Sequence, residues 1–224
     1  MPRNVGRILS ILVVVCSWTC TTLGDDLRTV FNGKNLDGWS AGPDNSWVVE
    51  NGEITLRRDF DGQEHNRDYL WIDGEFGDFV LELEFKVADN TNSGVYLRTG
   101  DRQDPVWTGI EVQVANSFGK DQLSSTGTAG AIYDCQKPAS NAIKAPGEWN
   151  QYRITCRGAQ LSVELNGQQV IDMNLDRWAK PNQNPDGSQN KFNTALKDFP
   201  RRGSVGFQDH GRPVWYRNVR LKEL

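Results

Sequence analysis

Short runs in which apolar and polar residues alternate recur along the chain, and this alternation constrains the fold more than any other feature. In the run 79–87, written FVLELEFKV, every second residue is apolar and most of the others are charged. A period of two puts successive side chains on opposite faces of a strand, so such a run is typical of a half-buried strand. The other alternating runs are 93–100, 109–115, 150–158, 161–173, 203–211 and 214–224.

The turns between these runs also favour sheet structure. Asn166-Gly167 divides the run 161–173 into two halves, and this dipeptide is the strongest short signal for a hairpin. No long run has the period of an amphipathic helix. We therefore predict an all-β fold, an antiparallel two-sheet sandwich whose sheets have one apolar and one polar face each. The long polar stretch 176–203 is expected to be a surface excursion, and long loops on a sandwich often carry function.

The N-terminus has the layout of a secretory signal peptide over residues 1–24. Arg3 and Arg7 precede an apolar run, and small residues stand just before Asp25. The apolar run is shorter than the roughly 20 residues that a spanning helix needs. We expect residues 25–224 to form a single domain that is exported, to the periplasm or beyond the cell, and has no membrane attachment after cleavage.

Charge and cysteine content narrow the partners and cofactors. The net charge is −4 and no basic stripe is present, which argues against nucleic acid as a partner. Cys135 and Cys156 could pair in an oxidising compartment or stay free, and the sequence leaves both open. Two thiols without a CxxC spacing make a poor metal site, so we predict no cofactor. Carboxylates in loops are compatible with a divalent metal ion, but their spacing matches no known metal-binding motif. The sequence does not determine the oligomeric state.

Several polar side chains share the strand face opposite to the predicted core. If their strands are neighbours in one sheet, these side chains line one polar surface, which is either a plain solvated face or a binding groove. Their chemistry favours a groove, and tryptophan rings elsewhere in the chain could stack on the C–H faces of sugars. The polar set is Tyr96, Arg98, Glu111, Gln113 and Gln208, and the tryptophans singled out are Trp71 and Trp215.

The chain has two histidines, and they stand in different surroundings. His210 follows Gln208 at the same parity, so it is expected at the rim of the polar surface. Three roles stay open for it: a hydrogen bond within its turn, an acid–base or substrate contact, or a metal ligand. His65 lies in a polar loop and is expected to be solvent-exposed.

Nine short sequences also occur in a characteristic order. Together they resemble the 3-keto-disaccharide hydrolase family over about residues 27–224. The resemblance implies a concanavalin A-like jelly-roll sandwich, related to legume lectins and β-glucanases, and action on glycosides oxidised to a ketone at C3. The nine are FNGKNLDGWS, WVVENGEI, NSGVYLRTG, GIEVQV, TGTAGAIYD, APGEWNQYRI, LNGQQV, ALKDFPRRGSVGFQDHG and VWYRNVRLKEL.

An ordinary glycosidase needs two carboxylates that flank the bond. β-Glucanases of this architecture alternate such a pair on one strand, but here Gln113 takes the second position beside Glu111. A second acid would have to come from Asp134, Glu84 or Asp209. A 3-keto sugar offers another route, because its ketone acidifies the C2 proton. A base removes that proton, the enolate expels the group at C1, and water then adds across the double bond.

We therefore expect an exported enzyme that cleaves 3-keto-glycosides by hydrolysis or by elimination and hydration. Glu111 or His210 is the expected base, and Arg98 and Gln113 are the expected donors to the enolate oxygen. The alternative is a non-catalytic glycan-binding module, since the same fold serves both purposes. The acid is expected from Tyr133, Asp134 or His210. The expected contacts to an oligosaccharide or glycoside come from Gln113, Tyr96, Gln208, Tyr133, Asp134, Trp71 and Trp215.

Overall fold

The computed structural model describes residues 1, 26–43, 45–57, 68–120 and 126–224. Residues 2–24 of the predicted signal peptide and His65 lie outside the described residues. Within the described ranges, no helix has the length and apolar character needed to cross a membrane.

Strands dominate the described chain, and the helices are single turns. The strands are β1 (Arg28–Thr29), β2 (Trp39–Ser40), β3 (Trp47–Glu50), β4 (Glu53–Leu56), β5 (Asp68–Ile72), β6 (Phe79–Val87), β7 (Asn92–Thr99), β8 (Ile110–Ala115), β9 (Trp149–Arg157), β10 (Gln160–Leu165), β11 (Gln168–Asn174), β12 (Ser204–Asp209) and β13 (Val214–Glu223). The helices are α1 (Pro105–Thr108), η1 (Leu175–Arg177) and η2 (Leu196–Asp198).

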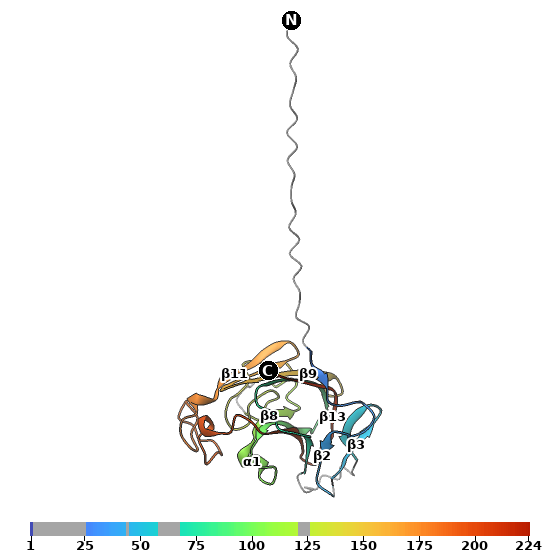
Figure 1. Cartoon of the computed structure of the whole chain (residues 1–224), viewed down its shortest axis with the longest axis horizontal. Helices are drawn as coiled ribbons and strands as arrows, with labels where there is room; N and C mark the ends of the chain where they lie inside the picture. The colour runs from blue at the N-terminus through green and yellow to red at the C-terminus, as the bar shows by residue number, and fades with distance from the viewer. Residues whose placement is uncertain (2–25, 44, 58–67, 121–125) are drawn as a thin grey trace.

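The strands of the described chain form two antiparallel sheets, so the predicted sandwich is confirmed. The larger, eight-stranded sheet has the order β11-β10-β9-β6-β13-β4-β3, with β1 paired to β13. The smaller, five-stranded sheet has the order β2-β5-β12-β7-β8. In Figure 1, β9 and β11 of the larger sheet form the upper layer, and β2 and β8 of the smaller sheet lie below them.

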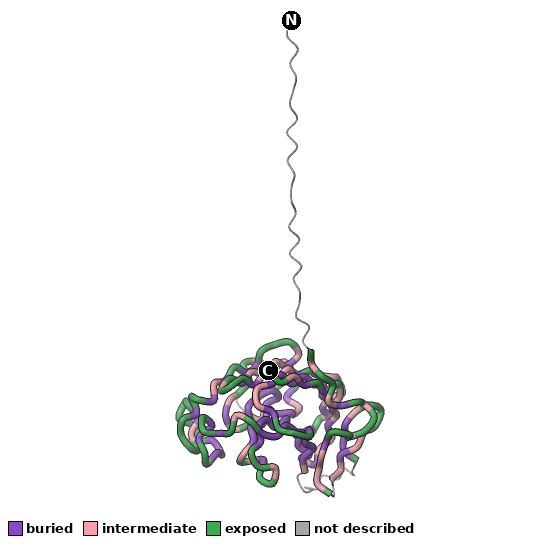
Figure 2. The backbone as a smooth tube through the Cα atoms, in the orientation of Figure 1, coloured by how far each residue is buried: buried purple, intermediate pink, exposed green. Residues whose placement is uncertain are grey.

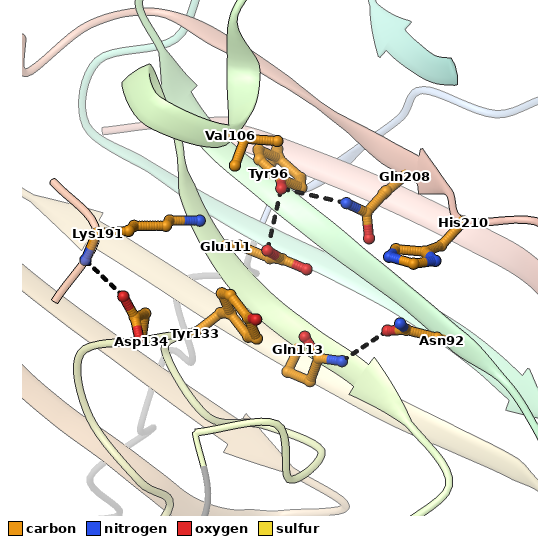
Figure 3. A pocket seen from close by; sticks show the side chains of 10 residues that line it. All are labelled: Asn92, Tyr96, Val106, Glu111, Gln113, Tyr133, Asp134, Lys191, Gln208 and His210. Atoms are coloured by element: carbon orange, nitrogen blue, oxygen red, sulfur yellow. Dashed lines mark hydrogen bonds between the residues drawn. The ribbon is translucent and has the colours of Figure 1, made fainter. Parts of the chain in front are cut away.

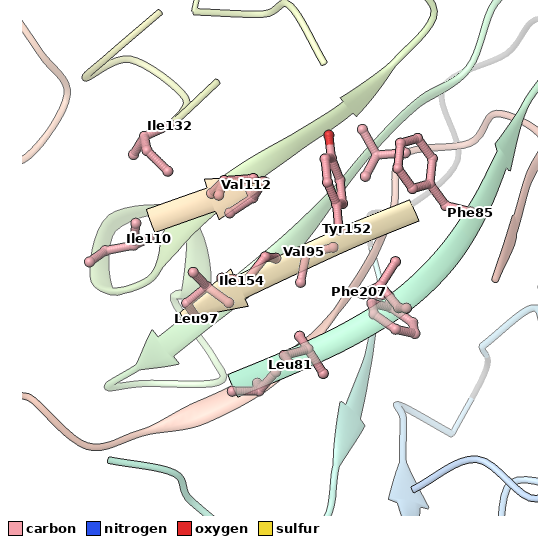
Figure 4. Packing of buried hydrophobic residues seen from close by; sticks show 14 of the residues in the cluster. Leu81, Phe85, Val95, Leu97, Ile110, Val112, Ile132, Tyr152, Ile154 and Phe207 are labelled. Atoms are coloured by element: carbon pink, nitrogen blue, oxygen red, sulfur yellow. The ribbon is translucent and has the colours of Figure 1, made fainter. Parts of the chain in front are cut away.

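The apolar positions of the alternating runs meet between the two sheets, where Figure 2 shows buried backbone and Figure 4 shows the packed side chains. Burying a side chain of this size stabilises the fold by roughly 1.5–3 kcal/mol. Because the inner face of each strand packs in this core, the polar groups of the smaller sheet lie on its outer face. Leu81, Phe85, Val95, Leu97, Ile110, Val112, Tyr152, Ile154 and Phe207 belong to this core.

The hairpin predicted at Asn166-Gly167 joins β10 to β11. Both turn residues have positive φ, 52° and 78°, which is the conformation of a type I′ turn. Asn tolerates this region and Gly has no side chain to oppose it, so the local sequence and the fold agree.

One irregularity interrupts β7, beside β12. Thr99 pairs with Ser204 and Tyr96 pairs with Gly206, so β7 uses one more residue than β12 between these two pairs. The bulge contains Arg98, whose φ is +47°. A bulge of this kind changes which face of the sheet the following side chains occupy.

Cys135 and Cys156 are both buried and both free, so the structure holds no disulfide between them. Burial raises the pKa of each thiol to about 12. Both side chains therefore remain protonated at neutral pH and pack as small apolar groups.

Candidate active site

A pocket of about 220 Å³ opens on the outer face of the smaller sheet (Figure 3). Its floor comes from β7, β8 and β12, and its sides come from α1 and from the loops around residues 133 and 191. Polar groups dominate its lining, as a site for a hydroxylated ligand requires. The lining residues are Asn92, Tyr96, Val106, Glu111, Gln113, Tyr133, Asp134, Lys191, Gln208 and His210.

Strand register brings the floor residues together. Tyr96 pairs with Glu111 across β7 and β8, and Gly94 pairs with Gln113 two positions further along. Gln208 lies on the adjacent strand β12, and His210 follows the end of that strand. The parity argument from the sequence thus placed Tyr96, Glu111, Gln113 and Gln208 correctly on one surface.

Glu111 lies at the centre of the floor and is only 5% exposed. The Tyr96 hydroxyl donates to its Oε2 at 3.0 Å. Burial, together with the negative charge of Glu111, holds the pKa of Tyr96 far above its ordinary value, so the phenol stays neutral and remains a donor. Gly94 provides the space for the carboxylate, because a Cβ at that position would lie 2.4 Å from Oε1 of Glu111.

Amide side chains extend this network across the floor. Gln208 Nε2 donates to the Tyr96 hydroxyl at 3.3 Å and to the Tyr69 hydroxyl at 3.4 Å. Gln113 Nε2 donates to Oδ1 of Asn92 at 3.0 Å, which fixes the orientation of the amide (Figure 3). Asn92, the first residue of β7, was not among the predicted site residues.

Two loops that are distant in the chain close one side of the pocket. The backbone N–H of Lys191 donates to Oδ2 of Asp134 at 2.5 Å. The Lys191 ammonium lies 4.9 Å from the centre of the Tyr133 ring and 5.1 Å from that of Phe192, within cation–π range. The predicted surface excursion 176–203 therefore contributes a cationic group, Lys191, to the pocket. Lys191 was not among the predicted site residues.

Asp134, Glu84 and Asp209 were the three candidates for a second acid beside Glu111. Of these, Asp134 lines the pocket. Glu84 lies on β6 of the larger sheet, where it accepts hydrogen bonds from Arg217 and Asn218. Burial acts to raise the pKa of Glu84, but these hydrogen bonds and the Arg217 charge outweigh it and lower the pKa. Asp209 is fully buried and accepts from the backbone N–H of Gly211, inside the turn that follows β12.

The prediction that Arg98 lines the polar face is wrong. Its side chain is 2% exposed and donates to the carbonyls of Gly77 and Gly158 and to Oδ1 of Asp78. The bulge in β7 explains the error, because a residue at φ +47° leaves the alternation on which the parity argument rests. Arg98 joins β7 to the segments around β6 and β9 and does not line the pocket.

Neither of the two predicted tryptophans lines this pocket. Trp215 is on β13 of the larger sheet, with the Lys86 ammonium 4.8 Å from its ring centre. Trp71 is on β5 and packs against the rings of Tyr69 and Tyr96, so it stands beside the pocket without lining it.

In chemical terms, the pocket combines a buried carboxylate, a neutral phenol, an imidazole, an ammonium and a second carboxylate. Such a set can remove a proton from carbon, stabilise a developing oxyanion and protonate a leaving group. Across the ranges that the structure describes, no group of three or more His, Cys, Asp or Glu side chains is placed to hold a metal ion.

Known proteins resemble the chain over most of its length. A relative from Bacteroides thetaiotaomicron, named 3-keto-disaccharide hydrolase, is 28% identical, with 89% of this chain and 79% of the relative covered. A crystal structure from Parabacteroides distasonis ATCC 8503, provisionally named a glycosyl hydrolase, matches with a TM-score of 0.76 and 30% identity, covering 89% of this chain and all of that one.

A more distant structure supports the fold alone. The Bacillus licheniformis β-glucanase is 14% identical, with a TM-score of 0.51 over 88% of this chain and 97% of its own.

Residues 26–222 match the family model described as a 3-keto-alpha-glucoside-1,2-lyase-like domain. The family that the nine sequence motifs predicted is therefore confirmed, and the chain belongs to the 3-keto-alpha-glucoside-1,2-lyase-like domain family.

Proposed function

We propose that the chain is an exported enzyme that cleaves glycosides carrying a ketone at C3 of the sugar. The observation that carries this proposal is the position of Glu111, on the pocket floor between Lys191 and His210 (Figure 3). The Tyr96 hydroxyl holds one of the Glu111 carboxylate oxygens in place. Family membership and the name of the Bacteroides relative support the choice of substrate.

The first half of the reaction is an elimination. Glu111 takes the C2 proton, and the electron pair of the C–H bond forms the enolate with C3. The Lys191 ammonium and the Gln113 amide, which both line the pocket, donate to the enolate oxygen. The enolate then expels the C1 oxygen, and the C3 ketone re-forms beside a new C1–C2 double bond. His210 or Asp134 supplies the proton that the departing oxygen takes.

The second half restores a saturated sugar. Water adds its oxygen to C1 and gives one proton back to His210 or Asp134, whichever protonated the leaving group. The proton held by Glu111 returns to C2. The sum of both halves is hydrolysis, with no change in oxidation state. This sequence needs one base at C2 rather than the flanking carboxylate pair of an ordinary glycosidase, which agrees with Gln113 in the position of the second acid.

The test compares a chromogenic 3-keto-glucoside with the unoxidised glucoside. Glu111→Gln should lower kcat/KM for the keto substrate by about 10²–10⁴-fold, the range typical of a lost general base. Glu84→Gln is the matched control, because its carboxylate lies on the larger sheet, and it should keep wild-type activity. A keto substrate deuterated at C2 should react more slowly than its protiated form.

Each other outcome has a definite meaning. Equal turnover of both glucosides, or no effect of deuterium at C2 even in single turnovers, would rule out the elimination. Turnover of neither glucoside, with sugar binding still measurable, would favour a glycan-binding module.

We propose further that side-chain donors suffice for the enolate and that no cofactor takes part. Turnover should then be unchanged after dialysis against EDTA, and loss of activity that Mn²⁺ or Ca²⁺ restores would contradict this. Export is proposed from the layout of residues 1–24 alone. N-terminal sequencing of the protein from the producing cell should find a chain that begins near Asp25.

A further inference from the structure

A second pocket, of about 480 Å³, opens on the same side of the smaller sheet. Its walls come from β2, β5 and the segment that leads into α1. Asp68, Tyr69, Trp71, Arg102 and Gln103 are among its lining residues. None of these residues lines the pocket that holds Glu111.

The two pockets are neighbours. Tyr69 lines the second pocket and Tyr96 lines the first, and their ring centres are 5.1 Å apart in an edge-on contact. Gln208 donates to both hydroxyls, so one amide holds the partition between the pockets. On α1, Pro105 lines the second pocket and the next residue, Val106, lines the first. The two pockets therefore share one wall.

The wall of the second pocket is firmly held. The rings of Tyr69 and Trp71 stack at 5.3 Å with 16° between their planes. The Arg102 guanidinium lies 5.5 Å from the Trp71 ring centre and donates to the hydroxyls of Ser204 at 2.7 Å and Ser40 at 3.0 Å. A site fixed by its own packing loses little entropy when a ligand binds.

Two polar side chains remain open to a ligand in this wall. Asp68 Oδ1 accepts from the backbone N–H of Tyr69 at 2.7 Å, while Oδ2 accepts no hydrogen bond from the described residues. Gln103 is exposed, and its contact to Asp101 is made by its backbone N–H. A carboxylate and an amide beside an aromatic wall suit a pyranose, since the carboxylate accepts from its hydroxyls and the amide both donates and accepts.

We propose that this second pocket binds the leaving sugar of a disaccharide whose 3-keto unit lies over Glu111. The proposal rests on the proposed function for its orientation, because the leaving unit is the one attached to the C1 oxygen. Asp68 is then a specificity-determining residue that touches the departing sugar, and not a proton carrier. The pocket selects substrates whose second unit presents hydroxyls to Oδ2.

The experiment uses two substrates in parallel, a 3-keto-disaccharide of two glucose units and methyl 3-keto-glucoside, which has no second sugar. Asp68→Asn keeps the Oδ1 acceptor for Tyr69 but removes the charge. Gln103→Ala removes a side chain that makes no hydrogen bond to any of the described residues. Asp68→Asn should lower kcat/KM for the disaccharide by about tenfold, the scale of one hydrogen bond to a charged group, and Gln103→Ala should lower it by less, because its amide is neutral. The methyl glycoside should be unaffected. Asp73→Asn, an exposed site after β5, is the matched control.

Equal losses on both substrates, or no loss on the disaccharide, would overturn the second-sugar site. Absence of turnover by the wild type would overturn the proposed function instead, and the site would then be tested by calorimetry. In that case a weaker Kd of Asp68→Asn for the disaccharide, with an unchanged Kd for methyl 3-keto-glucoside, supports the site. Equal Kd values for wild type and variant would reject it.

Discussion

Gly94 and Glu111 show how one missing side chain makes room for a reactive group. The two residues lie on neighbouring strands, and the Glu111 side chain occupies the volume that a side chain at 94 would fill. Gly94 is not in the left-handed region, so its backbone does not demand glycine. Space for the carboxylate is therefore the physical reason for glycine at this position.

Gly94→Ala should displace the Glu111 carboxylate, because the new Cβ would come within 2.4 Å of Oε1 and 2.7 Å of Cγ. We expect kcat/KM on a 3-keto-glucoside to fall at least tenfold, with the overpacking costing about 1–3 kcal/mol of stability. Gly100→Ala is the control, since its nearest neighbour would be Pro200 Cγ at 3.4 Å. Wild-type kinetics for Gly94→Ala would show that Glu111 is free to move.

Tyr96 yields a prediction about pH. Burial raises its pKa far above the ordinary value of 10.0, so the phenol keeps its proton throughout the range in which the enzyme would be assayed. The alkaline limb of the kcat/KM profile should therefore lie at the same pH in wild type and in Tyr96→Phe, although the variant is slower. A limb that disappears in Tyr96→Phe would mean that Tyr96 ionises during the reaction.

At the scale of elements, alternation predicted each strand that forms the pocket floor, and it failed where β7 departs from regular geometry. Tyr96, Glu111 and Gln113 follow from parity, whereas Arg98 does not, because a bulge depends on the pairing with β12. No local sequence pattern predicts the extra residue of this bulge in β7.

Two further residues mark the limits of the sequence argument. Trp215 was misplaced because alternation shows which face a side chain occupies but not which sheet the strand joins. Lys191 was missed because its loop is positioned by a contact with Asp134, 57 residues away in the chain. Both properties are set by tertiary pairing rather than by local pattern.

Arg98→Lys tests the structural role of the bulge. A lysine cannot reach Gly77, Gly158 and Asp78 together, because it lacks the planar fork of donors. We expect a loss of about 1.5–3 kcal/mol in the free energy of unfolding for each charged hydrogen bond that is lost. Chemical denaturation would measure it, with the exposed Arg57→Lys as control. Unchanged stability with a reduced kcat would restore Arg98 to the catalytic residues.

At the scale of the whole molecule, the buried thiols report on the integrity of the sandwich. Alkylation requires a thiolate, and burial raises the pKa of Cys135 and Cys156 to about 12. Iodoacetamide at about pH 8 should leave both unmodified in the native protein and label both in denaturant. Peptide mass spectrometry would distinguish the two thiols. Rapid native labelling of either one, or a disulfide between them, would contradict the described packing.

The central place of β13 in the larger sheet has a consequence for how the protein is made. β13 lies between β6 and β4 and also carries β1, so residues 214–223 join parts of the sheet that are otherwise separate. A chain that ends at residue 213 should therefore be degraded by protease under conditions in which the whole chain resists. Long-range pairing of this kind delays folding. A nascent chain thus emerges with open sheet edges and no finished domain, the loose state that the export proposed above requires.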